Sequence, residues 1–253
     1  MIAVISDIHG NLEALLAVFD HLRQRRVKRI FFLGDLIGYG PDPGRVIDFL
    51  KHFEFCLQGN HDLAVLKGAP DYFNKAAQRA VAWTRSQVSP YEMKMKWLRN
   101  REYIRRLEAW KFLLSLRPAR RLGELYFVHD TPAAPGSCGY VRNMETAQKV
   151  FAADPSVTAF FIGHSHVPKV ITEGGMAAPE YGKKYVFRDG RAIVNVGSVG
   201  QPRDKDPRAC YVILDEEGWR FFRVPYDVEA TAAKIRATGA LDSILADRLF
   251  KGV

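Results

Sequence analysis

The sequence predicts an α/β fold in which short strands alternate with helices. Runs of β-branched and aromatic residues stop at polar residues, apolar residues recur at helical spacing between the runs, and 253 residues with 47% hydrophobic content can bury one substantial core. We therefore expect one domain over residues 1–253, with a helical insertion at about 71–121, where the alternation stops.

Strands are predicted at residues 2–6, 29–34, 54–58, 124–129, 159–163 and 192–196, with a hairpin at 210–224. A helix is expected between the first two strands, because Asn11 can cap it, Glu13 lies in its first turn, and one face collects apolar residues: Leu12, Leu15, Leu16, Phe19 and Leu22.

A second helix is predicted after the second strand. Asp42 is placed to cap it, Pro43 suits its first position, and its buried face is Val46, Ile47, Leu50 and Phe53.

The insertion contains no predicted strand between residues 71 and 123. We expect one helix near residues 75–88 and a longer one after Ser89, since Ser89, Pro90 and Glu92 form the pattern of a capping box.

The net charge of +9 is concentrated in the second half of the insertion. This excess suits either a solvated helix face or an anion-binding surface, and the residues are Arg99, Arg101, Arg105, Arg106, Lys111, Arg117, Arg120 and Arg121.

Side chains that bind metals gather where the predicted strands end. Asp7 and His9 follow the first strand, two residues apart, so an extended chain points them the same way. The later strand ends supply Asp35, Asn60, His129, and the pair His164 and His166. Ligands of open α/β sheets bind beyond such strand ends, which predicts a common site.

The distribution of histidine supports a metal site. Of the seven histidines, only His21 and His52 fall in predicted helices; the others are His9, His61, His129, His164 and His166. Because imidazole is prominent, we expect manganese, iron or zinc in preference to magnesium or calcium.

The motifs D-x-H, G-D, G-N-H-D, a lone histidine and G-H-x-H occur in this order and resemble those of the calcineurin-like metallophosphoesterases. The segments 38–43 (GYGPDP) and 195–204 (NVGSVGQPRD) resemble the small bacterial and archaeal phosphodiesterase-like branch. The resemblance covers nearly the whole chain and implies a four-layer α-β-β-α sandwich with a dinuclear metal site at the strand ends.

The resemblance also implies ligand roles. Asp7, His9 and His166 would bind one divalent metal, Asn60, His129 and His164 the other, and Asp35 would bridge them. A metal-bridging hydroxide would attack phosphorus in line. The two ions would be Mn, Fe, Zn or Ni, with manganese expected first.

His61 would protonate the departing alkoxide or stabilise phosphoryl charge, for which a near-neutral pKa is suited. Asp62 would either orient His61 or stabilise a turn. Arg203 would contact substrate phosphate or form an ion pair with Asp204.

Asp130 departs from the H-G-S-P sequence that this branch more often has after the lone histidine. It could tune the second metal, repel highly anionic substrates, or cap the following turn.

The expected activity is metal-dependent hydrolysis of phosphodiesters or phosphomonoesters, with a small phosphate ester or nucleotide as substrate. The alternatives are a nuclease or nucleotide phosphohydrolase, and a noncatalytic metal-binding interaction scaffold. We expect a cytoplasmic protein without a membrane segment, because the three cysteines form no framework and no apolar run is long enough to span a bilayer. The sequence is compatible with either a monomer or a homo-oligomer.

Overall fold

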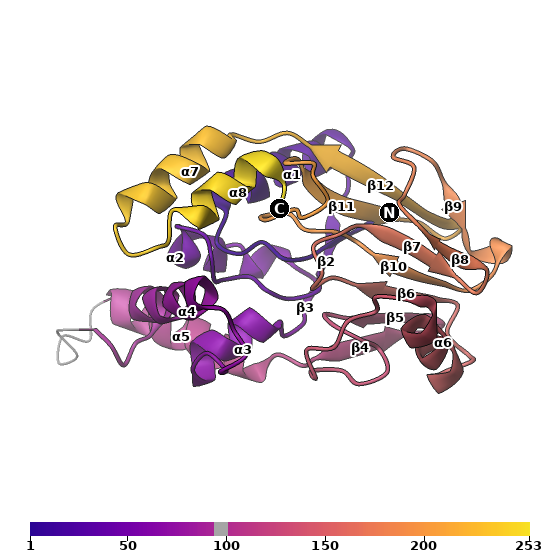
Figure 1. The fold of residues 1–253 in the computed structure, drawn as a ribbon, viewed down its shortest axis with the longest axis horizontal. Helices are drawn as coiled ribbons and strands as arrows, with labels where there is room; N and C mark the ends of the chain where they lie inside the picture. The colour runs from indigo at the N-terminus through magenta and orange to yellow at the C-terminus, as the bar shows by residue number, and fades with distance from the viewer. Residues whose placement is uncertain (94–100) are drawn as a thin grey trace.

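The computed structural model describes residues 1–93 and 101–253 and contains two mixed six-stranded sheets (Figure 1). The first sheet has the order β3 (Phe55–Cys56), β2 (Arg29–Phe32), β1 (Ile2–Ile5), β11 (Ala209–Leu214), β12 (Gly218–Val224) and β9 (Tyr185–Val186). The second has the order β4 (Ala119–Leu122), β5 (Leu125–Val128), β6 (Ala159–Ile162), β10 (Ala192–Asn195), β7 (Lys169–Thr172) and β8 (Gly175–Ala177). The α/β prediction is confirmed.

Both faces of the central strands are buried, which explains why their sequences are continuously apolar. In β1, Val4 points into the core between the sheets, whereas Ala3 and Ile5 pack against helices. In β6, Phe161 points into the core between the sheets and Phe160 points outward. The layers therefore follow the order α-β-β-α.

Helices cover the outer faces. α1 (Leu12–Gln24) packs on the first sheet, and α6 (Met144–Ala153) packs on the second. α7 (Val228–Ala237) and α8 (Ile244–Lys251) lie at the same end of the molecule as α2 (Pro43–Ile47), opposite the end formed by β8 and β9 (Figure 1). Over the described residues, no helix is long and apolar enough to cross a membrane.

The cap of α1 is confirmed, because the Asn11 side chain accepts a hydrogen bond from the backbone N–H of Ala14 at 3.0 Å. Leu16 is an exception on the predicted apolar face, since 42% of it is exposed.

The helix predicted at Asp42 is shorter than expected. α2 ends at Ile47 and is followed by a 3-10 turn, η1 (Leu50–His52). Asp42 makes no side-chain capping bond, because its carboxylate instead accepts from Lys234 Nζ at 2.7 Å.

The insertion is helical, although its boundaries differ from the prediction. It follows α3 (Asn60–Lys67) and contains α4 (Lys75–Val88), as predicted, and α5 (Arg101–Ser115). The capping box is wrong: Ser89 ends α4, and Glu92 accepts from Arg85 Nε at 2.7 Å. The predicted start of the longer helix partly lies outside the described residues, at 94–100.

Four short strands were not predicted: β4, β7, β8 and β9. β4 lies in the segment predicted to be free of strands, with Arg120 and Arg121 at its centre, and it pairs only with β5 at the sheet edge. Charged residues are common on edge strands, where they discourage aggregation, and they hide the alternating pattern.

Three of the seven described basic residues named for the insertion are paired with acids. Arg105 lies 2.8 Å from Asp48, Arg106 lies 2.8 Å from Glu102, and Arg121 lies 2.6 Å from Asp154. Arg99 lies outside the described residues. At Arg105, Arg106 and Arg121 the charge is neutralised by a neighbouring acid, whereas both expectations for the rest of the basic stretch stay predictions.

Candidate metal centre

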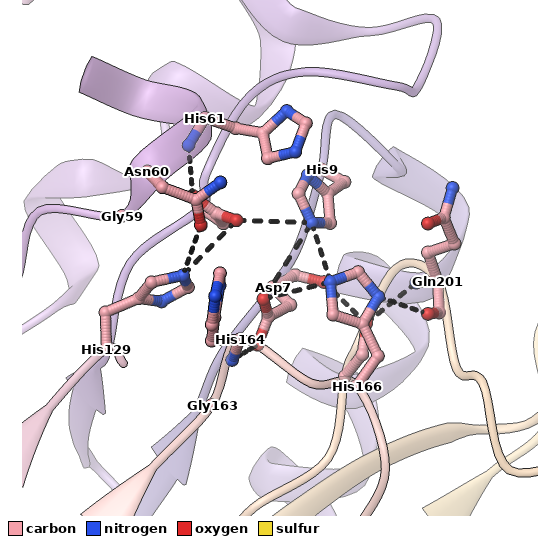
Figure 2. Close-up of polar contacts among 12 residues, drawn as sticks. Asp7, His9, Gly59, Asn60, His61, His129, Gly163, His164, His166 and Gln201 are labelled. Atoms are coloured by element: carbon pink, nitrogen blue, oxygen red, sulfur yellow. Dashed lines mark hydrogen bonds and ion pairs between the residues drawn. The ribbon is translucent and has the colours of Figure 1, made fainter. Parts of the chain in front are cut away.

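Seven predicted ligands converge at one edge shared by the two sheets (Figure 2). Asp7, His9 and Asp35 follow β1 and β2 of the first sheet, whereas His129, His164 and His166 follow β5 and β6 of the second. Asn60 is the first residue of α3. The charged and imidazole members of the set are all buried.

One group of ligand atoms comes from Asp7, His9, Asp35 and His166, whose potential donor atoms all lie within 4.8 Å of one another. His166 Nε2 lies 3.1 Å from Asp7 Oδ1, and His9 Nε2 lies 3.5 Å from Asp35 Oδ2.

A second group comes from Asp35, His129 and His164, also within 4.8 Å of one another. His129 Nε2 lies 3.3 Å from Asp35 Oδ2 and 3.1 Å from Asn60 Oδ1, which brings the amide to the same group. Asp35 belongs to both groups through a single oxygen, and its other oxygen accepts from the backbone N–H of His61 at 2.8 Å.

The imidazole tautomers fit a cation. His166 Nδ1 lies 2.6 Å from the carbonyl oxygen of Gln201, and His9 Nδ1 lies 3.4 Å from that of Ile37. A carbonyl can only accept, so each Nδ1 carries the proton and each Nε2 presents a lone pair. The two Nε2 atoms are only 3.1 Å apart, and Asp7 Oδ1 is buried without a hydrogen bond. A divalent cation would satisfy all three atoms.

Five ligands adopt a left-handed backbone conformation, which costs free energy in residues other than glycine. The φ values are 55° for Asp7, 49° for His9, 60° for Asp35, 64° for His164 and 60° for His166. This conformation turns each side chain inward at the end of its strand. Nothing in the residue types reveals it, so sequence reasoning missed it.

Gly59 makes room for the shared carboxylate. A Cβ atom at this position would lie 2.0 Å from Asp35 Oδ1, far inside contact distance. The G-N-H-D motif therefore needs glycine for close approach rather than for an unusual φ.

The electrostatics keep the two carboxylates ionised. Burial alone would raise the pKa of Asp7, but His166 beside it holds that pKa well below its ordinary value. At Asp35, too, burial would raise the pKa, but the neighbouring His129 outweighs this effect and holds the pKa well below its ordinary value. Burial also lowers the pKa of His164 to about 3, so its ring is neutral at pH 7. At His129 the effect of burial is outweighed by Asp35, which raises the pKa of that ring to about 10, so a metal would have to displace its proton. Ionised carboxylates and neutral imidazoles are the forms that bind metals.

His61 lies beside these ligands, with its ring centroid 4.9 Å from that of His9 and 4.8 Å from that of Phe73. Burial lowers the pKa of His61 to about 4, in contrast to the near-neutral value expected from its proposed role. Its Nδ1 is buried without a hydrogen-bond partner among the described residues.

The expected hydrogen bond between Asp62 and the His61 ring is not found in the described residues. Asp62 Oδ2 accepts from the backbone N–H groups of Asp35 and Gly59, at 2.9 and 3.2 Å, and Oδ1 accepts from that of Ile37 at 3.2 Å. The alternative of a structural aspartate therefore fits the geometry, because these backbone donors leave no oxygen directed at the ring.

Arg203 borders a cavity of about 330 Å³ above the ligands. The expected alternative, an ion pair with Asp204, is not formed, because Asp204 pairs with Arg223. The Arg203 guanidinium instead donates to Gln201 Oε1 at 2.6 Å and lies 5.7 Å from the ring centroid of Tyr39.

Aromatic residues that the sequence did not single out form the cavity wall: Tyr39, Tyr72, Phe73 and Tyr140. Tyr140 stacks on His164, with ring centroids 4.1 Å apart. Tyr39 lies in the segment 38–43, and Tyr72 and Phe73 lie at the start of the predicted insertion, whereas Tyr140 lies in no segment that the sequence motifs marked.

Asp130 organises the loop that carries Tyr140. Its carboxylate accepts from the backbone N–H groups of Gly136 at 3.1 Å and Cys138 at 2.6 Å. Of the three expectations for Asp130, these bonds match the capping of the following turn. The carbonyl of Cys138 in turn lies 3.3 Å from His164 Nε2, which leaves Nδ1 of that ring for a metal.

The family comparison agrees with this geometry. The family model described as a calcineurin-like phosphoesterase superfamily domain matches residues 1–218. The chain belongs to the calcineurin-like phosphoesterase superfamily.

Whole-chain relatives come from archaea and bacteria. The uncharacterized protein MJ0912 of Methanocaldococcus jannaschii is 37% identical over 257 residues, which cover 100% of this chain and 98% of that protein. The crystal structure of a metallophosphoesterase from Sphaerobacter thermophilus is similar with a TM-score of 0.83 and 34% identity, covering 100% of this chain and 98% of that one. The hypothetical protein PH1004 of Pyrococcus horikoshii shares the fold at 16% identity, with a TM-score of 0.74 and coverage of 100% and 99%.

Proposed function

We propose that this chain is a dinuclear metal-dependent phosphoesterase that hydrolyses phosphodiester or phosphomonoester bonds in small substrates such as nucleotides. The observation that carries the proposal is the position of Asp35 Oδ2, which lies 3.5 Å from His9 Nε2 and 3.3 Å from His129 Nε2. A carboxylate oxygen shared by two neighbouring ligand groups suits a pair of divalent ions. Superfamily membership supports a hydrolase.

Within this proposal, Asp7, His9 and His166 bind one ion, Asn60, His129 and His164 bind the other, and Asp35 binds both. Two divalent ions would bind the phosphate oxygens and stabilise their charge. They would also lower the pKa of a water molecule, which would supply the nucleophile. Mn²⁺ is our first choice, with Fe, Zn and Ni as alternatives, because the ligands mix imidazole and carboxylate.

The protein's own residues would orient the ester and shield the reaction. Arg203 is placed at the cavity wall to donate to a phosphate oxygen. His61 also lines the cavity, and its neutral ring would donate a hydrogen bond to a phosphoryl or leaving oxygen. The aromatic wall would exclude water from the reacting phosphate.

The test is hydrolysis of bis-p-nitrophenyl phosphate and p-nitrophenyl phosphate by metal-stripped protein after Mn²⁺, Ni²⁺, Zn²⁺ or Mg²⁺ is restored. We expect turnover that requires metal and falls by about 10²-fold or more in His61→Ala, as loss of an acid–base group does. The ratio of the two rates ranks diester against monoester. A protein that binds two ions per chain but hydrolyses neither ester would favour the interaction scaffold.

The nuclease alternative gains little from Arg105, Arg106 and Arg121 of the basic insertion, because these three are paired with acids. We place the reaction in the cytoplasm, where the free cysteines Cys56, Cys138 and Cys210 would stay reduced.

A further inference from the structure

A second cavity of about 340 Å³ adjoins the cavity above the ligands. The two share Tyr140 and Arg203, which line both. Arg142 and Lys169 also line the second cavity, and no carboxylate is among its lining residues in the described part of the chain.

The three cations lack the acidic partners that several other basic residues of the described chain have. No ion pair is found for Arg142, Lys169 or Arg203 within residues 1–93 and 101–253, whereas Arg121 and Arg223 each contact an aspartate. The Arg142 guanidinium lies over Tyr140, 4.2 Å from the ring centroid, and the Arg203 guanidinium contacts two neutral side chains, those of Gln201 and Tyr39. Cations that converge on one cavity without acids attract an anion.

The second cavity is fixed rigidly to the ligand loop. Lys169 starts β7 and pairs in register with Asn195 at the end of β10. Asn195 Nδ2 donates to Gly163 O at 2.7 Å and to Ser165 Oγ at 2.9 Å, on either side of His164. The backbone N–H of Arg203 donates to His166 O at 3.1 Å. Two of the three cations are therefore held at a fixed offset from the ligands.

We propose that this cavity is a second anion subsite, which binds a phosphate group of the substrate other than the one that is hydrolysed. The inference rests on the proposed function and narrows its substrate class to phosphate esters that carry a second, nonreacting phosphate. Arg142, Lys169 and Arg203 bind that phosphate, and the group that links the two phosphates packs along Tyr140 at the junction of the cavities. Guanidinium groups suit this role, because they donate two parallel hydrogen bonds to phosphate.

The experiment compares two esters that differ by one phosphate: thymidine 5′-(4-nitrophenyl phosphate) and the same compound with a 3′-phosphate. Release of nitrophenolate by the metal-loaded protein gives kcat/KM for each. Calorimetry with metal-loaded His61→Ala gives Kd for each without rapid turnover. We expect the 3′-phosphorylated ester to be preferred by at least about tenfold in both measurements, since hydrogen bonds between charged groups contribute that much.

Substitutions assign the preference to the cavity. Lys169→Gln and Arg142→Gln, made separately, should each reduce the preference several-fold in kcat/KM and in Kd. Lys149→Gln is the matched control, because it removes the same charge from the exposed surface of α6 and should leave the preference as it is. The preference should also weaken as salt is raised.

Equal Kd values for the two esters, or a preference that survives both Lys169→Gln and Arg142→Gln, would overturn the second subsite. That result would leave the phosphoesterase proposal intact if both esters were hydrolysed. Conversely, if neither ester released nitrophenolate with any metal, the proposed function would fail, and the Kd comparison would still decide the subsite.

Discussion

Asp62 accepts a hydrogen bond from the backbone N–H of Asp35 at 2.9 Å, so a buried carboxylate supports the residue that belongs to both ligand groups. The same side chain accepts from Ile37, in the same loop as Asp35, and from Gly59, in the loop that precedes α3. We therefore expect Asp62 to position the predicted ligands, since its carboxylate accepts from backbone donors and has no hydrogen bond to the His61 ring among the described residues.

Asp62→Asn should lower the free energy of unfolding by about 1 to 3 kcal/mol, because the amide replaces one acceptor and leaves a buried backbone N–H unpaired. Metal content should fall as the loop of Asp35 loosens. Chemical denaturation and metal analysis measure the two effects. Asp20→Asn is the control, since Asp20 is exposed and forms a surface ion pair with Arg23. Unchanged stability and metal content in Asp62→Asn would contradict the positioning role.

Gly59→Ala should disrupt the shared carboxylate, because the new methyl group would lie 2.0 Å from Asp35 Oδ1. We expect a loss of about 1 to 3 kcal/mol in stability, as is typical of overpacking, together with reduced metal binding and activity. Gly174→Ala is the matched control, since the nearest atom to its Cβ is Thr172 Oγ1 at 3.8 Å. If both variants bind two ions equally well, the close approach of Gly59 to Asp35 is not required for metal binding.

Chelation should lower the melting temperature of the protein. Ligand binding at 100 times Kd stabilises a folded protein by about 2.7 kcal/mol, which corresponds to roughly 5 to 10 °C in a chain of this size. Scanning fluorimetry in EDTA, followed by restoration with Mn²⁺, measures the shift. A His9→Ala variant should respond less, because it loses one imidazole ligand. A melting temperature that changes neither in EDTA nor on addition of Mn²⁺ would argue against a resident metal.

Asp130→Asn should raise KM several-fold while metal content stays close to that of the original protein. The variant loses one acceptor oxygen for the backbone of Gly136 and Cys138, so the loop that carries Tyr140 loosens. Steady-state kinetics with metal analysis separates this effect from ligand loss. Asp154→Asn tests the loss of a turn-capping carboxylate elsewhere, at Ser156. A fall in bound metal would instead favour a direct influence of Asp130 on the second ion.

The strands near the centre of each sheet could be predicted because both of their faces are buried. Their sequences, such as Ile2–Ile5 and Ala159–Ile162, are apolar without interruption and end at the ligands. The edge strand Ala119–Leu122 could not be found this way, because solvent tolerates arginine at its centre. The capping box predicted at Ser89 is wrong, and Glu92 instead forms an ion pair with the nearby Arg85.

The types and order of the predicted ligands could be read from the sequence. The hydrogen bonds and cavity walls around them could not be predicted. The role of Asp62 depends on three backbone donors in two loops, and residue types do not reveal such donors. Tyr140 and Lys169 meet at one cavity only because distant loops fold together there. The spacing of residues along the chain does not predict such contacts between distant segments.

The ligands divide between the two sheets, with Asp7, His9 and Asp35 on one side and the remaining histidines on the other. The backbone N–H of His164 already joins the halves by donating to Asp7 Oδ2 at 3.1 Å. Ions bound by ligands from both sheets would cross-link two sheets that otherwise meet mainly through hydrophobic contact. Opening of the sandwich at this edge would then require release of the ions, so catalytic competence and the mechanical union of the sheets would be gained and lost together.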